Sequence, residues 1–285
     1  MNPALGSLLA LHFAVLLFGF AGLFGKWIAL SPLVIVLGRT AFAAATLAVW
    51  GLLTGRLIRP SLALAVNGVV LAVHWVSFFA AIQLADVATG LLGFASFPLF
   101  VLLLERWMVG RRWQQREAAT AALVTLGLVM LVPGLDWRDR ALQGLALGVV
   151  SGATFALLVI RSRGHVAVHP AVAIALWQNV FAALIIVPLL VALPAGLSAI
   201  TPRELILLAA LGVACTALAH TLFIASLRAV SAHTASVVSA LEPVYGIALA
   251  ALLLGEVPGI RTLAGALLIL GAAVNASRRP LDRVV

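Results

Sequence analysis

Long apolar runs alternate along the chain with short segments that hold most of the charged residues. Each run has about 20 residues, the length that an α-helix needs to cross the hydrocarbon core of a bilayer. Strands of a membrane barrel would alternate apolar and polar positions, and these runs do not. The pattern predicts an all-α, polytopic membrane protein with ten transmembrane helices, at 5–25, 32–54, 62–83, 87–107, 117–133, 142–161, 169–193, 204–226, 232–254 and 260–277.

The composition excludes the common classes of soluble protein. Of the 285 residues, 64% are hydrophobic and 9% are charged, whereas soluble domains are about half apolar and about a quarter charged. A soluble enzyme and a disordered or nucleic-acid-binding protein therefore do not fit. The first apolar run is too long for a signal peptide and is expected to be a retained helix. The single cysteine, Cys215, excludes an intrachain disulfide.

The net charge of +9 predicts an orientation rather than a nucleic-acid partner. If the N-terminus is cytoplasmic, the inner segments hold 12 Lys and Arg residues and the outer segments hold 5. Such an excess is typical of cytoplasmic loops, where these residues also meet anionic lipid. Both termini are therefore predicted to be cytoplasmic, and 279–285 forms a cytoplasmic tail.

An internal repeat relates the two halves of the chain. A shift of 145 residues aligns Thr89 with Thr234, Ala95 with Ala240, Pro98 with Pro243, Gly110 with Gly255 and Arg116 with Arg261. The predicted repeats are 1–135 and 141–278, each with five helices. Since five is odd, the second repeat enters the membrane from the opposite side. Inverted repeats are typical of secondary transporters, which bind substrate near the membrane midplane between the halves.

The second repeat resembles the EamA module of the drug/metabolite transporter (DMT) superfamily. The motifs are Glu242-Pro243-Val244-Tyr245, Leu252-Leu253-Leu254-Gly255-Glu256 and Gly265-Ala266-Leu267-Leu268-Ile269-Leu270-Gly271. The first repeat supplies Arg39, Pro98, Gly110 and Gly127, but Arg111 stands where the second has Glu256. The resemblance implies a ten-helix carrier of small metabolites, often an exporter, with amino acids as frequent substrates. The aromatic content is similar to that of the YddG-type amino-acid exporters.

Aromatic rings recur at matched positions of the third and eighth predicted helices. The shift of 145 places Trp75 on His220 and Phe78 on Phe223. Residues three or four apart share a helix face, and such rings can stack on a substrate and attract its ammonium group. Packing against lipid or neighbouring helices is the alternative. The residues expected to bind substrate with their rings are His74, Trp75, Phe78, Phe79, Phe155, His220 and Phe223.

Two charged residues lie inside predicted helices, where a central charge costs roughly 2.5–3.5 kcal/mol. Glu242 is expected to bind a substrate ammonium or to take up a proton, and a structural ion pair or hydrogen bond is the alternative. Arg39 suits a substrate carboxylate, and the alternatives are snorkelling to the outer interface or pairing with Asp86. Ser239 and Tyr245, close to Glu242 in sequence, are predicted to line the same cavity.

Pro98 and Pro243 occupy matched positions in the fourth and ninth predicted helices. Each lacks a backbone N–H and frees the carbonyl four residues earlier. Kinks at these positions are expected to let both helices bend during gating, although a static kink explains the prolines equally well.

The sequence holds no motif of a hydrolase, a zinc protease, a prenyltransferase or an ATPase. His165 and His169 have a metal-like spacing but no third ligand, so no metal or cofactor is expected. The prediction is a non-enzymatic secondary transporter that exports amino acids, aromatic or apolar ones included, or related metabolites across a bacterial inner membrane. Alternatives are a carrier of drugs or other metabolites and a lipid-modifying membrane enzyme. The expected partners are a small substrate and membrane lipid, and a monomer suffices to complete the cavity.

Overall fold

The computed structural model describes residues 3–110, 115–131, 136–192 and 200–277, and every regular element in them is helical. The elements are α1 (Pro3–Trp27), α2 (Pro32–Leu53), α3 (Leu62–Leu84), α4 (Val87–Phe94), α5 (Phe97–Val109), α6 (Gln115–Leu131), α7 (Arg140–Val166), α8 (Ala171–Ala192), α9 (Pro202–Gly212), the π-helix η1 (Val213–Leu218), α10 (Ala219–Ser226), α11 (Ala232–Ser239), α12 (Glu242–Leu254) and α13 (Ile260–Ser277).

Seven helical segments of the described chain are long and apolar enough to cross a membrane. They are Leu5–Trp27, Pro32–Leu53, Leu62–Leu84, Val87–Met108, Arg140–Val166, Ala171–Ala192 and Pro202–Ser226. The other three predicted spans contain shorter apolar helices, Ala119–Met130, Glu242–Leu254 and Ile260–Ala272. The prediction of ten transmembrane helices in two inverted repeats therefore stays a prediction, as do the repeat boundaries. The predicted tail, 279–285, lies outside the described residues.

Three predicted spans differ from the observed helices. The sixth continues five residues past its predicted end, to Val166, because Arg163 and His165 in the last turn favour the negative end of the helix dipole. The fourth and ninth are each interrupted by a short turn, at residues 95–96 and 240–241. A proline stands at the second position after each turn, where its missing N–H removes no helical bond.

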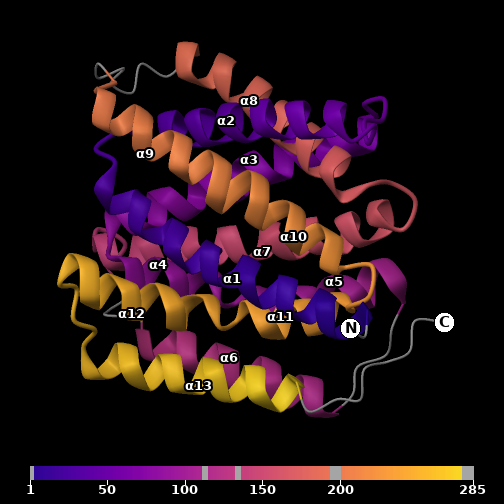
Figure 1. Cartoon of the computed structure of the whole chain (residues 1–285). Helices are drawn as coiled ribbons and strands as arrows, with labels where there is room; N and C mark the ends of the chain where they lie inside the picture. The colour runs from indigo at the N-terminus through magenta and orange to yellow at the C-terminus, as the bar shows by residue number, and fades with distance from the viewer. Residues whose placement is uncertain (1–2, 111–114, 132–135, 193–199, 278–285) are drawn as a thin grey trace.

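The helices run roughly parallel and antiparallel across one bundle (Figure 1). In this view α2, α8 and α9 form the upper side and α6 and α13 form the lower side. α2 packs on α8 and α6 packs on α13, while α3 packs on α7 and α1 packs on α10 and α12. The helices that meet in the middle of the bundle therefore come from both halves of the chain.

The same helix-to-helix contact occurs twice. Gly212 of α9 lies against Phe42 of α2, and Gly68 of α3 lies against Phe181 of α8. Gly68 and Gly212 are 144 positions apart, whereas α4 and α5 match α11 and α12 at 145. The π-helix lies directly after Gly212 and accommodates one additional residue. This accounts for the change from 144 to 145.

Glycines of α7 let the middle helices approach each other closely. Gly144, Gly148 and Gly152 are four residues apart and face α3, α4 and the turn after α4. A Cβ added to Gly148 would lie 2.7 Å from the carbonyl oxygen of Gly90 and 2.9 Å from the Cα of Gly93. Small residues at this spacing permit backbone contact between membrane helices. The contact fixes the distance between α7 and α4, both of which contribute rings to the centre of the bundle.

A side chain at Gly148 must force α4 and α7 apart, because the neighbouring atoms are backbone. Overpacking of this kind costs about 1–3 kcal/mol or more. We expect Gly148→Leu to lower the unfolding temperature in detergent markedly, as measured by intrinsic tryptophan fluorescence. Gly164→Leu is the matched control, since Gly164 lies on the same helix with nothing within 4 Å of the added Cβ. Equal unfolding temperatures for the two variants would contradict the close packing.

Candidate functional site

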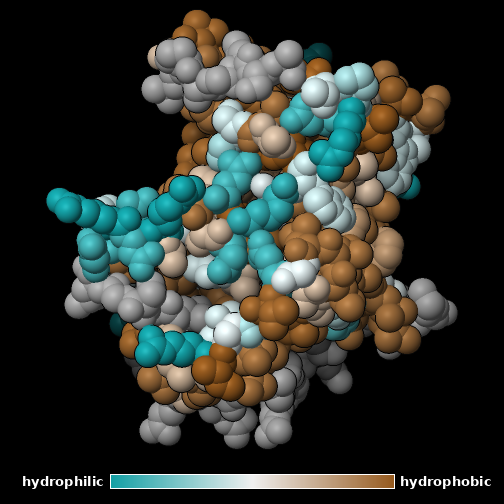
Figure 2. Space-filling view, turned by 90° about the vertical axis from the view of Figure 1, so that its left-hand side faces the viewer, coloured by the Kyte–Doolittle hydropathy of each residue, from teal (hydrophilic) through white to brown (hydrophobic). Residues whose placement is uncertain are grey.

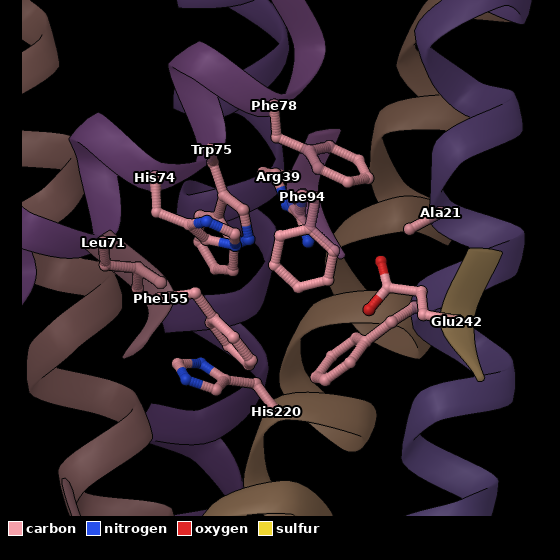
Figure 3. A pocket seen from close by; sticks show the side chains of 11 residues that line it. Ala21, Arg39, Leu71, His74, Trp75, Phe78, Phe94, Phe155, His220 and Glu242 are labelled. Atoms are coloured by element: carbon pink, nitrogen blue, oxygen red, sulfur yellow. The ribbon is translucent and has the colours of Figure 1, made fainter. Parts of the chain in front are cut away.

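A cavity of about 390 Å³ lies in the middle of the bundle. Helices α1, α2, α3, α4, α7, α10 and α12 contribute to its wall, and Figure 3 shows their side chains converging on one space. The lining residues are Phe18, Ala21, Arg39, Leu71, His74, Trp75, Phe78, Phe94, Phe155, His220 and Glu242. The cavity is thus largely apolar and aromatic, with one cation and one carboxylate.

Arg39 is held inside the bundle rather than reaching toward the membrane surface. Only 2% of the residue is exposed, and its guanidinium carbon lies 3.8 Å from the ring centre of Trp75. Its Nε donates a hydrogen bond of 3.0 Å to Oγ1 of Thr216, which lies in the π-helix. Asp86, the alternative partner, instead caps the N-terminus of α4. In the described part of the chain the two Nη groups of Arg39 have no hydrogen-bond partner, so they are free to bind a ligand.

Glu242 faces the same cavity from the first position of α12. The positive end of a helix dipole favours a carboxylate there. The residue is 3% exposed, and among the described residues its carboxylate accepts no hydrogen bond and forms no ion pair within 4.0 Å. Figure 3 shows the carboxylate pointing into the cavity from the side opposite the histidines. The structural ion pair considered from the sequence is therefore not made in the described chain.

Phe155 of α7 is the centre of the ring cluster. Its ring centre lies 5.0 Å from that of His74 in a stacked arrangement and 5.4 Å from that of Phe94. It lies 5.3 Å from the ring of Phe223. Aromatic pairs at these separations hold one another in fixed orientations. The cluster therefore gives the cavity a rigid apolar wall.

The two histidines of the wall differ in their polar contacts. Nδ1 of His74 lies 3.0 Å from the carbonyl oxygen of Ser151 and 2.8 Å from Oγ of the same residue. This contact orients the imidazole of His74 and joins α3 to α7. His220 packs edge-on against Trp75 at 5.8 Å between ring centres. Its Nδ1 is buried without a hydrogen-bond partner among the described residues.

The structure brings seven of the eleven predicted binding residues to the cavity wall. They are Arg39, His74, Trp75, Phe78, Phe155, His220 and Glu242. The other four lie just behind it. Phe79 lies behind Arg39, with the guanidinium carbon 5.3 Å from its ring centre, and Phe223 supports Phe155. Ser239 is buried in the last turn of α11, and Tyr245 packs on α1 at Gly19. Binding by any of the eleven stays a prediction.

Sequence reasoning missed four residues of the wall, Phe18, Ala21, Leu71 and Phe94. Phe18 aligns with Phe155 at a shift of 137 residues, so the repeat could have identified it. Ala21 and Leu71 carry no polar or aromatic signal. Phe94 enters the wall because it is the last residue of α4, at the turn before α5.

Pro98 and Pro243 lie beside the cavity rather than in its wall. Each is the second residue of its helix, α5 or α12, directly after the turn that interrupts the span. In the second half this interruption places Glu242 at a helix N-terminus. Movement at these turns stays a prediction.

Polar contacts join three helices at the end of the molecule that is predicted to face outward. Nζ of Lys26, at the end of α1, donates to the carbonyl oxygen of Ala85 at 2.9 Å and lies 3.8 Å from Oε1 of Glu256. Oε2 of Glu256 accepts from the backbone N–H of Val87 at 3.0 Å. These contacts join α1, α4 and the segment after α12. Hydrophilic residues gather in the middle of this face in Figure 2. Arg111, the counterpart of Glu256, lies outside the described residues.

Comparison with known proteins agrees with this geometry. Residues 142–278 match the EamA-like transporter family. One solved structure, described only as "Crystal structure of protein", has a TM-score of 0.75 and 20% identity, covering 98% of this chain and 99% of that chain. This likeness shows a shared fold. No curated protein matches the chain.

The family match covers the segment that contributes Phe155, His220 and Glu242 to the cavity. Members of the EamA family are transporters, and the apolar helices agree with a multi-pass membrane protein. Residues 142–278 are therefore an EamA domain, which places the protein among the transporters of the drug/metabolite transporter superfamily.

Proposed function

We propose that the protein is a secondary transporter that carries apolar or aromatic amino acids outward across a bacterial inner membrane by alternating access. The observation that carries the proposal is the enclosed aromatic cavity with one guanidinium and one carboxylate in its wall. A zwitterion complements both charges. Its carboxylate meets the Nη groups of Arg39, and its ammonium meets Glu242.

The burial of both charges supports a zwitterionic substrate. A buried charge without a partner is costly, and in the described chain no ion pair joins Arg39 to Glu242 within 4.0 Å. A bound zwitterion supplies the missing partner to each. Guanidinium binds carboxylate through paired donors, and the ring of Trp75 holds the Arg39 guanidinium in position. The substrate side chain then packs among the rings around Phe155.

The size of the cavity supports a small substrate. Ligand pockets commonly have volumes of about 300–1,000 Å³, and 390 Å³ lies near the lower limit. A carrier of drugs or other metabolites is the second candidate, and the ring cluster favours it when the substrate is a flat cation. Such a substrate would leave Arg39 without a partner, which is why we favour the amino acid.

The repeated elements support a mechanism with two alternating states. α4 and α5 match α11 and α12 at a shift of 145, and the interruptions of both spans coincide. We propose ten helices in two inverted repeats, with both termini cytoplasmic. Each repeat then closes one side of the cavity in turn. The contacts of Glu256 with Lys26 and Val87 close the outer side and must break when that side opens.

Exchange in proteoliposomes tests the proposed function. Vesicles loaded with unlabelled amino acids are expected to accumulate labelled Phe, Trp, Leu, Met or Thr by counterflow. Trp75→Ala removes the ring that holds Arg39, and Glu242→Gln removes the ammonium partner. A lost cation–π or charge contact is worth about 1–2 kcal/mol, so we expect each variant to lower exchange about tenfold or more.

The matched control for Trp75→Ala is Trp107→Ala, since Trp107 is 84% exposed and far from the wall. It is expected to retain wild-type exchange. If folded wild-type protein accumulates no labelled amino acid, the amino-acid assignment is wrong and a carrier of other metabolites replaces it. If Trp107→Ala loses as much exchange as Trp75→Ala, the cavity is not the site of transport.

Removing the outer contacts is expected to open the cavity to that side. Glu256→Ala deletes the ion pair with Lys26 and the acceptor for the N–H of Val87. Hydrogen bonds to charged groups are worth about 1.5–3 kcal/mol, and 1–2 kcal/mol corresponds to a population change of about 5–30-fold. The readout is the rate at which a membrane-impermeant thiol reagent labels Ala21→Cys in a Cys215→Ala background.

The expected result is faster labelling from the outside by at least about fivefold. Asp136→Ala is the matched control, because Asp136 is an exposed acid at the same end and caps only a local turn. An unchanged labelling rate in Glu256→Ala would show that these contacts do not hold the outer side closed.

A further inference from the structure

A second cavity, of about 860 Å³, lies at the opposite end of the molecule from the Lys26–Glu256 contacts. It is formed where α2 ends, α8 begins and α10 ends, which is the right-hand end of the bundle in Figure 1. The orientation predicted from the sequence places this end at the cytoplasmic side. The lining residues are Trp50, Arg56, Pro170, Ala171, Val172, Thr221, Leu222, Ala225 and Arg228.

Two guanidinium groups stand at this cavity, and no acidic residue is among its lining residues. Arg56 is exposed in the segment after α2, and its side chain has no hydrogen-bond partner or ion pair in the described chain. Arg228 donates from Nε to the carbonyl oxygen of Val166 at 2.9 Å and from Nη2 to that of His169 at 2.8 Å. These two bonds fix the position of the Arg228 guanidinium and leave Nη1 free. The cavity therefore presents uncompensated positive charge.

The start of α8 adds donors at the same place. The backbone N–H groups of Ala171 and Val172 belong to the first turn, and no acceptor is found for them among the described residues. The positive end of the helix dipole favours a phosphate there. A helix N-terminus alone does not make a binding site, so a second and independent feature is needed.

Thr221 of α10 is that second feature. The residue lines the cavity, is 5% exposed, and its Oγ1 is buried without a hydrogen-bond partner in the described chain. A threonine hydroxyl in a helix commonly bonds to a carbonyl of the preceding turn, as Thr40 and Thr46 do here. An unsatisfied buried hydroxyl costs free energy unless a ligand pairs with it.

The rest of the lining is apolar. Trp50, at the end of α2, is 37% exposed, and Leu222 and Ala225 of α10 are half-buried. Trp is enriched at the depth of the membrane where headgroups meet acyl chains. An inorganic anion would use the charged groups and leave this apolar surface empty. A lipid uses both.

We propose that this cavity binds one anionic phospholipid of the leaflet that it faces. Its phosphate lies between Arg56, Arg228 and the start of α8, and an acyl chain lies along Trp50 and Leu222. Basic pockets between membrane helices bind anionic headgroups. A zwitterionic headgroup such as choline finds no acidic residue in the lining for its cation. The site is separate from the central cavity, and the proposal does not rest on the proposed function.

The test compares two lipids with identical acyl chains, phosphatidylglycerol and phosphatidylcholine, added to the full-length protein in detergent. The readouts are the unfolding temperature and the number of lipids retained in native mass spectrometry. We expect phosphatidylglycerol to raise the unfolding temperature with one lipid retained, and phosphatidylcholine to have a much smaller effect. Sodium phosphate and glycerol phosphate serve as probes of a free anion and are expected to have none.

Arg56→Gln carries the test at the level of the residue, because Arg56 makes no side-chain contact that the fold needs. One lost charge-assisted hydrogen bond corresponds to about tenfold weaker binding of phosphatidylglycerol. The matched control is Arg59→Gln, since Arg59 is exposed in the same segment but outside the lining. It is expected to bind the lipid as the wild type does.

Thr221→Val separates lipid binding from a structural role. Replacing an unpaired buried hydroxyl by a methyl group is expected to leave the lipid-free protein at least as stable, yet to weaken the response to phosphatidylglycerol. Three results would overturn the proposal. They are an equal response to both lipids, equal weakening in Arg59→Gln and Arg56→Gln, and an equal rise of the unfolding temperature with free phosphate.

Discussion

Arg39 is a permanent cation buried among apolar helices, and much of the central structure is arranged around it. A charge at this depth costs roughly 2.5–3.5 kcal/mol on insertion scales. The ring of Trp75 offsets part of this cost through its π face, and Thr216 accepts the hydrogen bond of Nε. Thr216 is available because the chain forms a π-helix there, in which its hydroxyl bonds to the carbonyl of Leu211. What these contacts leave unpaired is directed at the cavity, so one constraint links the packing to the site.

Close helix contacts set the dimensions of that cavity. Gly148 lets α7 touch α4, and Gly19 of α1 lies against the backbone of Glu242. These contacts bring Phe155 and Glu242 to opposite sides of one space, which larger residues at the glycines would widen. The interruption of the ninth span contributes equally, because it turns Glu242 from a residue in the middle of a helix into the first residue of α12.

The repeat in the sequence predicted the central residues well, because symmetry constrains pairs rather than single positions. Trp75 and His220 were paired by the shift of 145, and their rings are in contact. Applied to the first helix, the same logic would have added Phe18. The π-helix was not predictable from Val213–Leu218, since it depends on the contact with Arg39 in a distant helix. Helical periodicity also could not distinguish the rings in the wall from Phe79 and Phe223, which lie one layer behind it.

The central claim is that the cavity recognises a zwitterion through Arg39 and Glu242 together. The most direct measurement is counterflow with three compounds of the same shape, phenylalanine, phenethylamine and 3-phenylpropionate. The latter two each lack one of the two charges. A site that pairs both charges discriminates against either analogue by at least about tenfold, so only phenylalanine should be exchanged at the full rate. Exchange of phenethylamine as fast as phenylalanine would contradict the account and identify a carrier of cations that uses Glu242 and the rings alone.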